Sequence, residues 1–226
     1  MADNSIIDTT IYIGNVAIHE PVTVFTDFII TGLCLYFYIT LNRLADNTKS
    51  TNNWKYFFLC LSAASLAGGC SHGFFEIHQG PGYKFFWLTM QALNVGSVYF
   101  AQQATLHSAL NNSTNKKYWS LSYRIQLLLF FIAIFIYHNF LVVIIDSAIG
   151  LFPIMIIHFM DAKKNKNSLW IAYGIVVLCL TAIVNTIKLS FHAYFNHLDL
   201  AHLLIMINLS LIFVGVKRKA ISSSAA

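Results

Sequence analysis

The stretch from Phe140 to Phe159, FLVVIIDSAIGLFPIMIIHF, decides the fold class of this chain. Apart from one carboxylate, Asp146, and one imidazole, His158, it contains almost only apolar side chains. A helix of roughly 20 mainly apolar residues is long enough to cross the roughly 30 Å hydrocarbon core of a bilayer. We therefore predict that this stretch is a transmembrane helix.

Six further runs of the same kind lie on either side of it. They are Pro21–Leu41, Trp54–Phe75, Phe85–Ser108, Trp119–Tyr137, Leu169–Ile187 and Leu198–Val216. The composition agrees, because 57% of the 226 residues are hydrophobic, only 10% are charged, and the mean hydropathy is +0.63. Strands of a membrane barrel would instead alternate polar and apolar residues over about 10 positions. The sequence thus predicts an all-α seven-transmembrane helix bundle at residues 20–217, between an N-terminal segment at 1–19 and a tail at 218–226.

Basic residues are distributed unevenly between the two ends of these predicted spans. Twelve of the 14 Lys and Arg follow the first, third, fifth and seventh spans: Arg43, Lys49, Lys55, Lys116, Lys117, Arg124, Lys163, Lys164, Lys166, Lys217, Arg218 and Lys219. Positive residues in short loops mark the cytoplasmic side. This predicts the N-terminus outside and the C-terminus in the cytoplasm, with Lys84 and Lys188 as exceptions. The clusters suit anionic membrane lipids, so the pI of 9.0 does not indicate nucleic-acid binding.

Acidic and imidazole side chains gather in the predicted outer half of the bundle. They are Glu20 and Asp27 around the first span, Ser71 with His72 and Glu76 at the end of the second, Asp146 in the fifth, and His197, Asp199 and His202 at the start of the seventh. Ionisable groups inside a membrane are costly, generally face the bundle interior, and mark functional sites. His107 and His158 lie near the predicted inner ends, where we expect a capping or snorkelling role.

This set of side chains predicts a zinc site. Imidazoles and carboxylates are the usual protein ligands of zinc, and a catalytic zinc keeps three such ligands and one water. His72, His197 and His202 can supply three nitrogens. Asp27 or Asp146 can then orient the water or act as a general base.

The spacing of the two histidines in the seventh span limits this prediction. Residues five apart on a regular helix point about 140° away from each other. His197 and His202 can therefore converge only if His197 precedes the helix proper, and Asn196, a good N-cap, allows the helix to start there. Otherwise Asp199 replaces His197 as the ligand.

The seven predicted spans, the Ser71-His72 pair and the paired histidines opening the seventh span resemble the CREST superfamily of membrane hydrolases. This group includes the alkaline ceramidases and the adiponectin and progestin receptors. The resemblance implies zinc held by one His of the second span and two of the seventh, and hydrolysis of a lipid amide by metal-activated water. Membrane lipids are then both substrate and partner. With its predicted external N-terminus, the chain resembles the ceramidase branch of this group in orientation.

Two segments, Glu20–Asp27 and Phe195–Asp199, are also similar to bacterial proteins placed near that group. This favours a bacterial inner membrane, with a eukaryotic endomembrane as the alternative. The chain departs from the family pattern where four residues rather than three separate the seventh-span histidines. It also has Gly68 where a second-span Ser usually stands, and only Gln91 near the position of the family's third-span Asp.

Two other function classes stay open at this point. The same cluster can be a structural metal site or a proton-sensing site of a non-enzymatic sensor or receptor, because histidines titrate in the physiological range. A transporter is the third reading, although no internal repeat is visible and the polar residues stop halfway across the predicted membrane. The oligomeric state cannot be read from the sequence.

Overall fold

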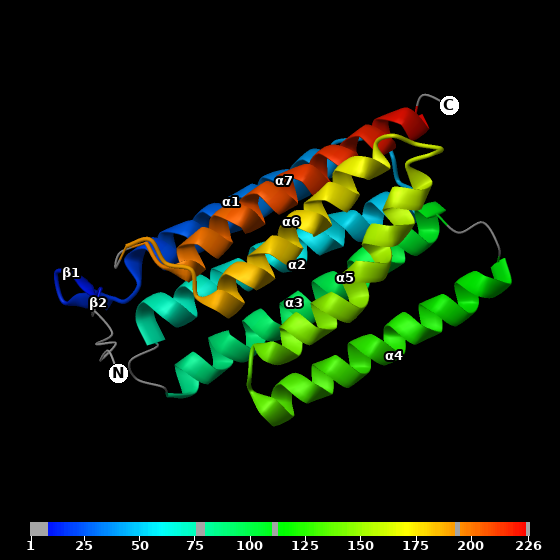
Figure 1. Ribbon diagram of the computed structural model, residues 1–226. Coiled ribbons are helices and arrows are strands. Elements are labelled where there is room, and N and C mark those ends of the chain that lie inside the picture. Colours follow the sequence, from blue (N-terminus) through cyan, green and yellow to red (C-terminus); the bar gives the residue numbers. More distant parts are fainter. Residues whose placement is uncertain (1–8, 76–79, 110–112, 193–194, 225–226) are drawn as a thin grey trace.

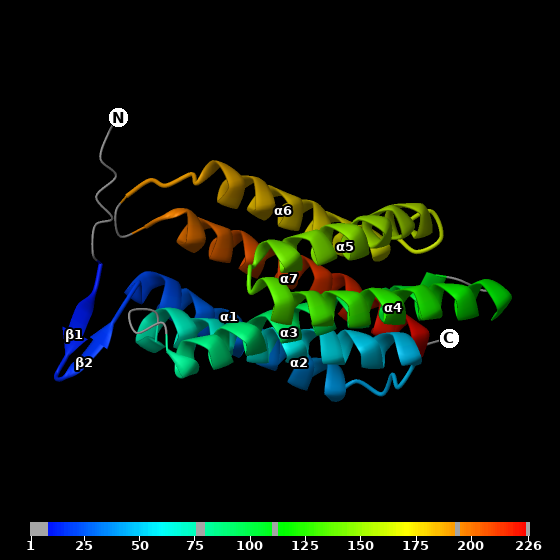
Figure 2. The same cartoon turned by 90° about the horizontal axis from the view of Figure 1, so that it is seen from below.

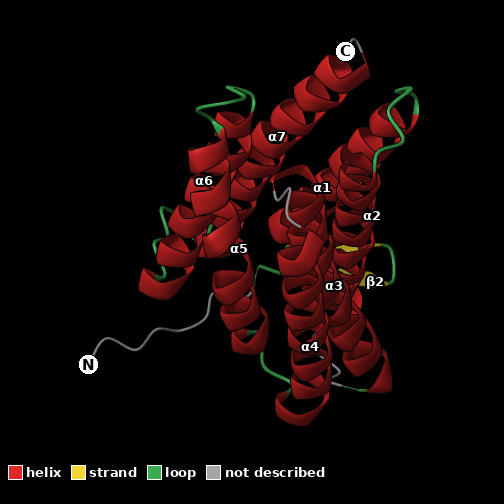
Figure 3. Ribbon diagram, turned by 90° about the vertical axis from the view of Figure 1, so that its right-hand side faces the viewer, coloured by secondary structure: helices red, strands yellow, loops and turns green. Residues whose placement is uncertain are grey.

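The computed structural model describes residues 9–75, 80–109, 113–192 and 195–224, and these are almost entirely helical (Figure 3). A short antiparallel hairpin, β1 (Ile11–Ile13) and β2 (Val16–Ile18), precedes the helices. The helices are α1 (Pro21–Asn42), α2 (Lys49–Cys70), α3 (Pro81–Ala109), α4 (Ser113–Tyr137), α5 (Leu141–Asp161), α6 (Ser168–Ile187) and α7 (His197–Ser224). A π-helical turn, Ser71–Phe75, extends α2. Each predicted span thus corresponds to one helix.

Six of the helices in the described residues are long and apolar enough to cross a membrane, which is compatible with an integral multi-pass membrane protein. The exception is α3. Its buried side chains include Gln91, Gln102 and Gln103, which lower its mean hydropathy. These amides lie inside the bundle because α3 packs against α2, α4 and α5. The low mean hydropathy of α3 therefore reflects polar side chains that lie inside the bundle.

The helices form a ring with one helix outside it. Neighbouring pairs α1–α2, α2–α3, α3–α5, α5–α6, α6–α7 and α7–α1 are all in contact and close the ring. Helix α4 packs mainly on α3 and α5 and lies at the edge of the bundle (Figure 1). Only 11% of the most apolar stretch of α4 is buried, so most of its side chains face outward.

The two ends of the bundle carry different side chains. We call the end with the β-hairpin, where α1 and α7 begin, the hairpin end (Figure 2). The opposite end, where α1 and α5 finish and α7 reaches Ser224, is the basic end. Helix α7 continues beyond residue 217, so the segment predicted as a separate tail begins as helix.

Polar contacts stabilise the basic end. The Nζ atom of Lys219 on α7 lies 2.8 Å from Oδ2 of Asp161 on α5, and both bond Ser168 of α6. His158 is fully buried, and its Nε2 lies 3.1 Å from Oγ1 of Thr105 on α3. The prediction that His158 snorkels or caps its helix is therefore wrong, because its ring points into the bundle rather than along the helix end.

Candidate functional site

Two acidic side chains of the candidate site, Glu20 just before α1 and Asp27 in its second turn, lie at the hairpin end. Pro21 occupies the first position of the helix, where its missing N–H and fixed φ suit helix initiation. Glu20 precedes it with a left-handed backbone, φ 41°. Thr23, Thr26 and Asp27 follow at helical spacing on one face, and all three are buried. This face of α1 is turned toward α7.

His72 lies on the π-helical turn that ends α2. Single π turns inside helices are rare and frequently occur at functional sites. The backbone N–H of His19 donates to the carbonyl of Gly73, which ties this turn to the start of α1. The Nδ1 atom of His72 lies 3.5 Å from Oε2 of Glu20, a distance that suits an ion pair. The turn thus brings the His72 imidazole to the acidic end of α1.

A capping box fixes the start of α7. The side chain of Asn196 accepts a hydrogen bond from the N–H of Leu198 at 2.7 Å, and Oδ2 of Asp199 accepts one from the N–H of Asn196 at 2.8 Å. The other oxygen of Asp199 accepts from the Thr23 hydroxyl at 2.9 Å. One oxygen of Asp199 therefore caps α7 and the other joins α7 to α1, which gives Asp199 a structural role.

His202 lies one turn further along α7, against Thr26 and Asp27. The Thr26 hydroxyl donates to the backbone carbonyls of Val22 and Thr23, at 3.0 Å and 2.9 Å. The Thr26 oxygen also lies 2.7 Å from Nδ1 of His202, and the direction of this hydrogen bond follows from the tautomer of the imidazole. When Nδ1 carries the hydrogen, it donates to Thr26. Nε2 then has the lone pair and lies 3.8 Å from Oδ1 of Asp27.

In this tautomer, two acceptor atoms face each other across the α1–α7 contact. Their separation of 3.8 Å is too long for a direct hydrogen bond. Zinc bonds to His nitrogen and carboxylate oxygen are each roughly 2.0–2.2 Å long. An ion shared by both atoms would hold them roughly 3.4 Å apart at a tetrahedral angle and roughly 4.1 Å apart if linear. The observed gap has the size that a bridging ion needs.

Helix α2 approaches Asp27 closely at Gly68. A Cβ atom at this position would lie 3.3 Å from Oδ2 of Asp27 and 3.2 Å from the sulfur of Met90. This is tighter than ordinary van der Waals contact, so a side chain here would press on the carboxylate. Gly68, four residues before His72, therefore lies beside the same cluster.

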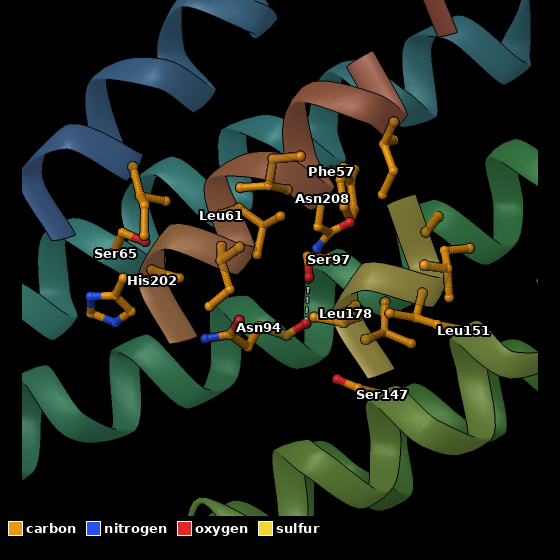
Figure 4. A pocket seen from close by; sticks show the side chains of 18 of the residues that line it. Phe57, Leu61, Ser65, Asn94, Ser97, Ser147, Leu151, Leu178, His202 and Asn208 are labelled. Atoms are coloured by element: carbon orange, nitrogen blue, oxygen red, sulfur yellow. Dashed lines mark hydrogen bonds between the residues drawn. The ribbon is translucent and has the colours of Figure 1, made fainter. Parts of the chain in front are cut away.

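A cavity of about 160 Å³ leads from this cluster into the bundle. Asp27 and His202 line it, together with mainly apolar side chains from every helix except α4. In Figure 4, His202 and Ser65 lie at one end of the cavity and Leu151 lies toward the other. An engineered apolar cavity of roughly 150 Å³ in another protein is large enough for benzene. The cavity beside Asp27 can thus hold part of an apolar chain.

Not every predicted site residue joins the cluster. His197 is the first residue of α7, on another face of the helix from His202, and it interacts electrostatically with Lys188 and Asp199. Asp146 accepts a 2.7 Å hydrogen bond from Gln126 of α4 and does not line the cavity. Ser71 is fully buried, and its Oγ finds no hydrogen-bond partner in the described part of the chain. Glu76 lies outside the described residues.

The donors at the cluster fit the chemistry of a zinc site only in part. Across the described ranges, no group of three or more His, Cys, Asp or Glu side chains is already arranged to hold a metal ion. His202 and Asp27 supply two facing donors. His72 interacts electrostatically with both of them and is the third candidate. Two imidazoles and one carboxylate form a donor set that catalytic zinc sites use.

Sequence reasoning missed Thr26. Thr26 immediately precedes Asp27 and lies four residues after Val22, so its hydroxyl looks like an ordinary backbone-bonded helix hydroxyl. Only the packing of α7 reveals that the same oxygen also contacts His202. Gly68 stood out in the sequence only as a departure from the family that the chain resembles, and its closeness to Asp27 follows from the packing of α2 on α1.

The fold and this cluster define a multi-pass helical membrane protein with an interior His–carboxylate site. The chain belongs to a family of unknown function, DUF6962, whose model matches residues 22–221. No curated protein and no solved structure matches the chain. The match spans all seven helices and therefore covers every described residue of the cluster except Glu20.

Proposed function

We propose that this chain is a zinc-dependent membrane hydrolase that cleaves a lipid amide, ceramide-like in chemistry. The observation that carries the proposal is the way the two imidazoles are held. Nδ1 of His72 faces Oε2 of Glu20, and Nδ1 of His202 bonds Thr26. Metal-binding histidines commonly engage one ring nitrogen with such an oxygen, which orients the other nitrogen toward the metal. A metal ion at this place would be held by the other nitrogen of each ring.

In this proposal, His72 and His202 would each hold zinc through one ring nitrogen, and Asp27 would supply one carboxylate oxygen. Zinc at this place would polarise an amide carbonyl and activate a water molecule. The second oxygen of Asp27 accepts the proton of that water and passes it to the leaving amine. Glu20 and Thr26 keep the imidazoles oriented. His197 and Asp146, which the sequence also suggested for this chemistry, take no part.

The cavity gives the proposed substrate its place. Its walls are mainly apolar, and it ends at Asp27 and His202. An acyl chain inside the cavity would place the adjoining amide at the cluster. Following the distribution of basic residues, we propose that the hairpin end faces outward and the basic end faces the cytoplasm, most simply in a bacterial inner membrane.

The test combines metal content with hydrolysis. The purified full-length protein is analysed for metals and then incubated with ceramide in phosphatidylethanolamine vesicles, with fatty-acid release as the readout. We expect bound zinc, release of fatty acid, loss of activity on chelation, and recovery when zinc is restored. Protein that contains no zinc, or activity that chelation leaves unchanged, would contradict the proposal.

A second function rests on the His202–Asp27 pair alone. Nε2 of His202 lies 3.8 Å from Oδ1 of Asp27, so this pair can take up a proton instead of a metal ion. The chain would then be a non-enzymatic membrane sensor whose bundle responds to protonation. Zinc-free protein whose α1–α7 contact changes with pH, followed by spin labels on the two helices, would favour this function over hydrolysis.

A further inference from the structure

A second hollow lies on the membrane side of the bundle, between α5 and α6. We call it the α5–α6 groove, and its volume is about 500 Å³. Ligand sites for small molecules commonly range over about 300–1,000 Å³. Its outer rim includes Ile149 and Phe152 of α5, which are 54% and 53% exposed. In a membrane-spanning bundle, such exposed apolar side chains contact lipid.

The α5–α6 groove adjoins the central cavity. Ser147 and Leu151 of α5 and Leu178 of α6 line both hollows. Figure 4 shows these three side chains beside the cavity, with Asn94 and His202 further along it. A chain that enters between α5 and α6 therefore has a direct route toward the candidate site.

One buried polar atom in the α5–α6 groove lacks a hydrogen-bond partner among the described residues. Asn185 of α6 lies two residues before the end of that helix, at the hairpin end. Its Oδ1 is buried and has no hydrogen-bond partner among the described residues. An unsatisfied polar atom in apolar surroundings is costly. Asn185 Oδ1 therefore calls for a ligand that donates a hydrogen bond.

The depth of Asn185 identifies the kind of ligand. A helix end lies near the boundary between lipid headgroups and acyl chains. The rest of the groove, from Ala148 to Leu151 and Leu178, extends from that level into the apolar layer. We propose that the α5–α6 groove binds a membrane lipid, with its acyl chain along the groove and a headgroup hydrogen-bond donor at Asn185. This binding requires neither zinc nor hydrolysis, so it stands apart from the proposed catalytic function.

The test uses two photoactivatable lipids in vesicles of phosphatidylethanolamine and phosphatidylglycerol. One is phosphatidylethanolamine with a diazirine in one acyl chain, whose ammonium donates hydrogen bonds. The other is the corresponding phosphatidylcholine, whose headgroup has no donor. After irradiation, mass spectrometry locates the labelled peptides. We expect labelling concentrated on α5 and α6, stronger with phosphatidylethanolamine, and unchanged in the zinc-site variant His202→Ala.

Matched variants separate binding in the groove from general contact with lipid. Ala148 lines the groove and is exposed, whereas Ile145 lies on the same helix, is 44% exposed, and does not line it. We expect Ala148→Trp to lose most of the labelling of α5 and α6, and Ile145→Trp to keep it. Asn185→Leu should abolish the preference for phosphatidylethanolamine. Equal labelling of α4, or undiminished labelling in Ala148→Trp, would overturn the proposal.

Discussion

The Nε2 atom of His202 on α7 lies 3.8 Å from Oδ1 of Asp27 on α1, while Nδ1 of the same imidazole lies 2.7 Å from the Thr26 hydroxyl. A separation of 3.8 Å is too long for a direct hydrogen bond and suits an ion shared by the two atoms. The predictions below follow from the proposal that a zinc ion fills this position, and from the packing that surrounds it.

Removing either imidazole should remove the metal. His72→Ala and His202→Ala each delete one of about three protein ligands, so zinc per protein should fall sharply. His107→Ala is the control, because His107 lies at the end of α3 near the basic end. Metal analysis of the purified variants gives the readout. Equal zinc content in all three variants would remove both histidines from the proposed site.

Thr26 should matter for metal binding although it is not a ligand. Thr26→Val keeps the shape of the side chain but leaves Nδ1 of His202 without its acceptor. Loss of such an orienting contact typically lowers metal affinity by about 10- to 100-fold. Thr31→Val is the matched control, since the Thr31 hydroxyl bonds only the carbonyl of Asp27 on the same helix. Competition with a zinc chelator measures the affinities, which should fall for Thr26→Val alone.

The two buried carboxylates should differ in catalysis. Asp27→Asn should lower ceramide hydrolysis by about 100-fold or more, the usual scale for a general base, while the protein stays folded. Asp146→Asn should remain active, because Asn still accepts the hydrogen bond from Gln126 and position 146 does not line the cavity. An inactive Asp146→Asn beside an active Asp27→Asn would move the catalytic role to α5.

Close packing at Gly150 should be required for stability. A Cβ atom there would lie 2.3 Å from Cγ1 of Val98 on α3, so Gly150→Ala forces the α3–α5 contact apart. Overpacking of this kind typically costs about 1–3 kcal/mol. At Gly32 of α1 an added Cβ meets nothing within 4 Å, so Gly32→Ala should not destabilise the protein. Thermal unfolding in detergent compares the two, and equal melting temperatures would contradict the packing argument.

The orientation in the membrane can be tested independently of the site. A reporter inserted after Ser190, between α6 and α7, should be external, and one fused behind α7 should be cytoplasmic, because most basic residues lie at the basic end. If the Ser190 reporter is instead found in the cytoplasm, the hairpin end and its cluster face inward.

The number and position of the helices could be predicted because chain length and apolar composition determine them. The first span was predicted at Pro21–Leu41 and α1 covers Pro21–Asn42. The predicted cap at Asn196 is confirmed, since its side chain accepts the N–H of Leu198. Both features depend on residues close in sequence, whose effects on the backbone are local.

The direction in which each polar side chain points could not be predicted. Rotation of a membrane helix about its axis depends on packing against its neighbours rather than on its own sequence. Hydropathy alone therefore places Asp27 and Asp146 at similar depths. The contact of α5 with α4 directs Asp146 to Gln126, and the contact of α1 with α7 directs Asp27 to His202. His197 and His202 lie on different faces because α7 already includes His197, the condition under which a spacing of five residues keeps them apart.

The ring of helices has a consequence for the order of events during synthesis. Glu20, Asp27 and His72 lie at the start of α1 and the end of α2, whereas His202 belongs to α7. The contact between α1 and α7 that unites them forms only after α2 to α6 have been made. A growing chain that has not reached α7 contains the acidic half of the cluster but not His202. An ion held by both halves would therefore have to bind after α7 is made.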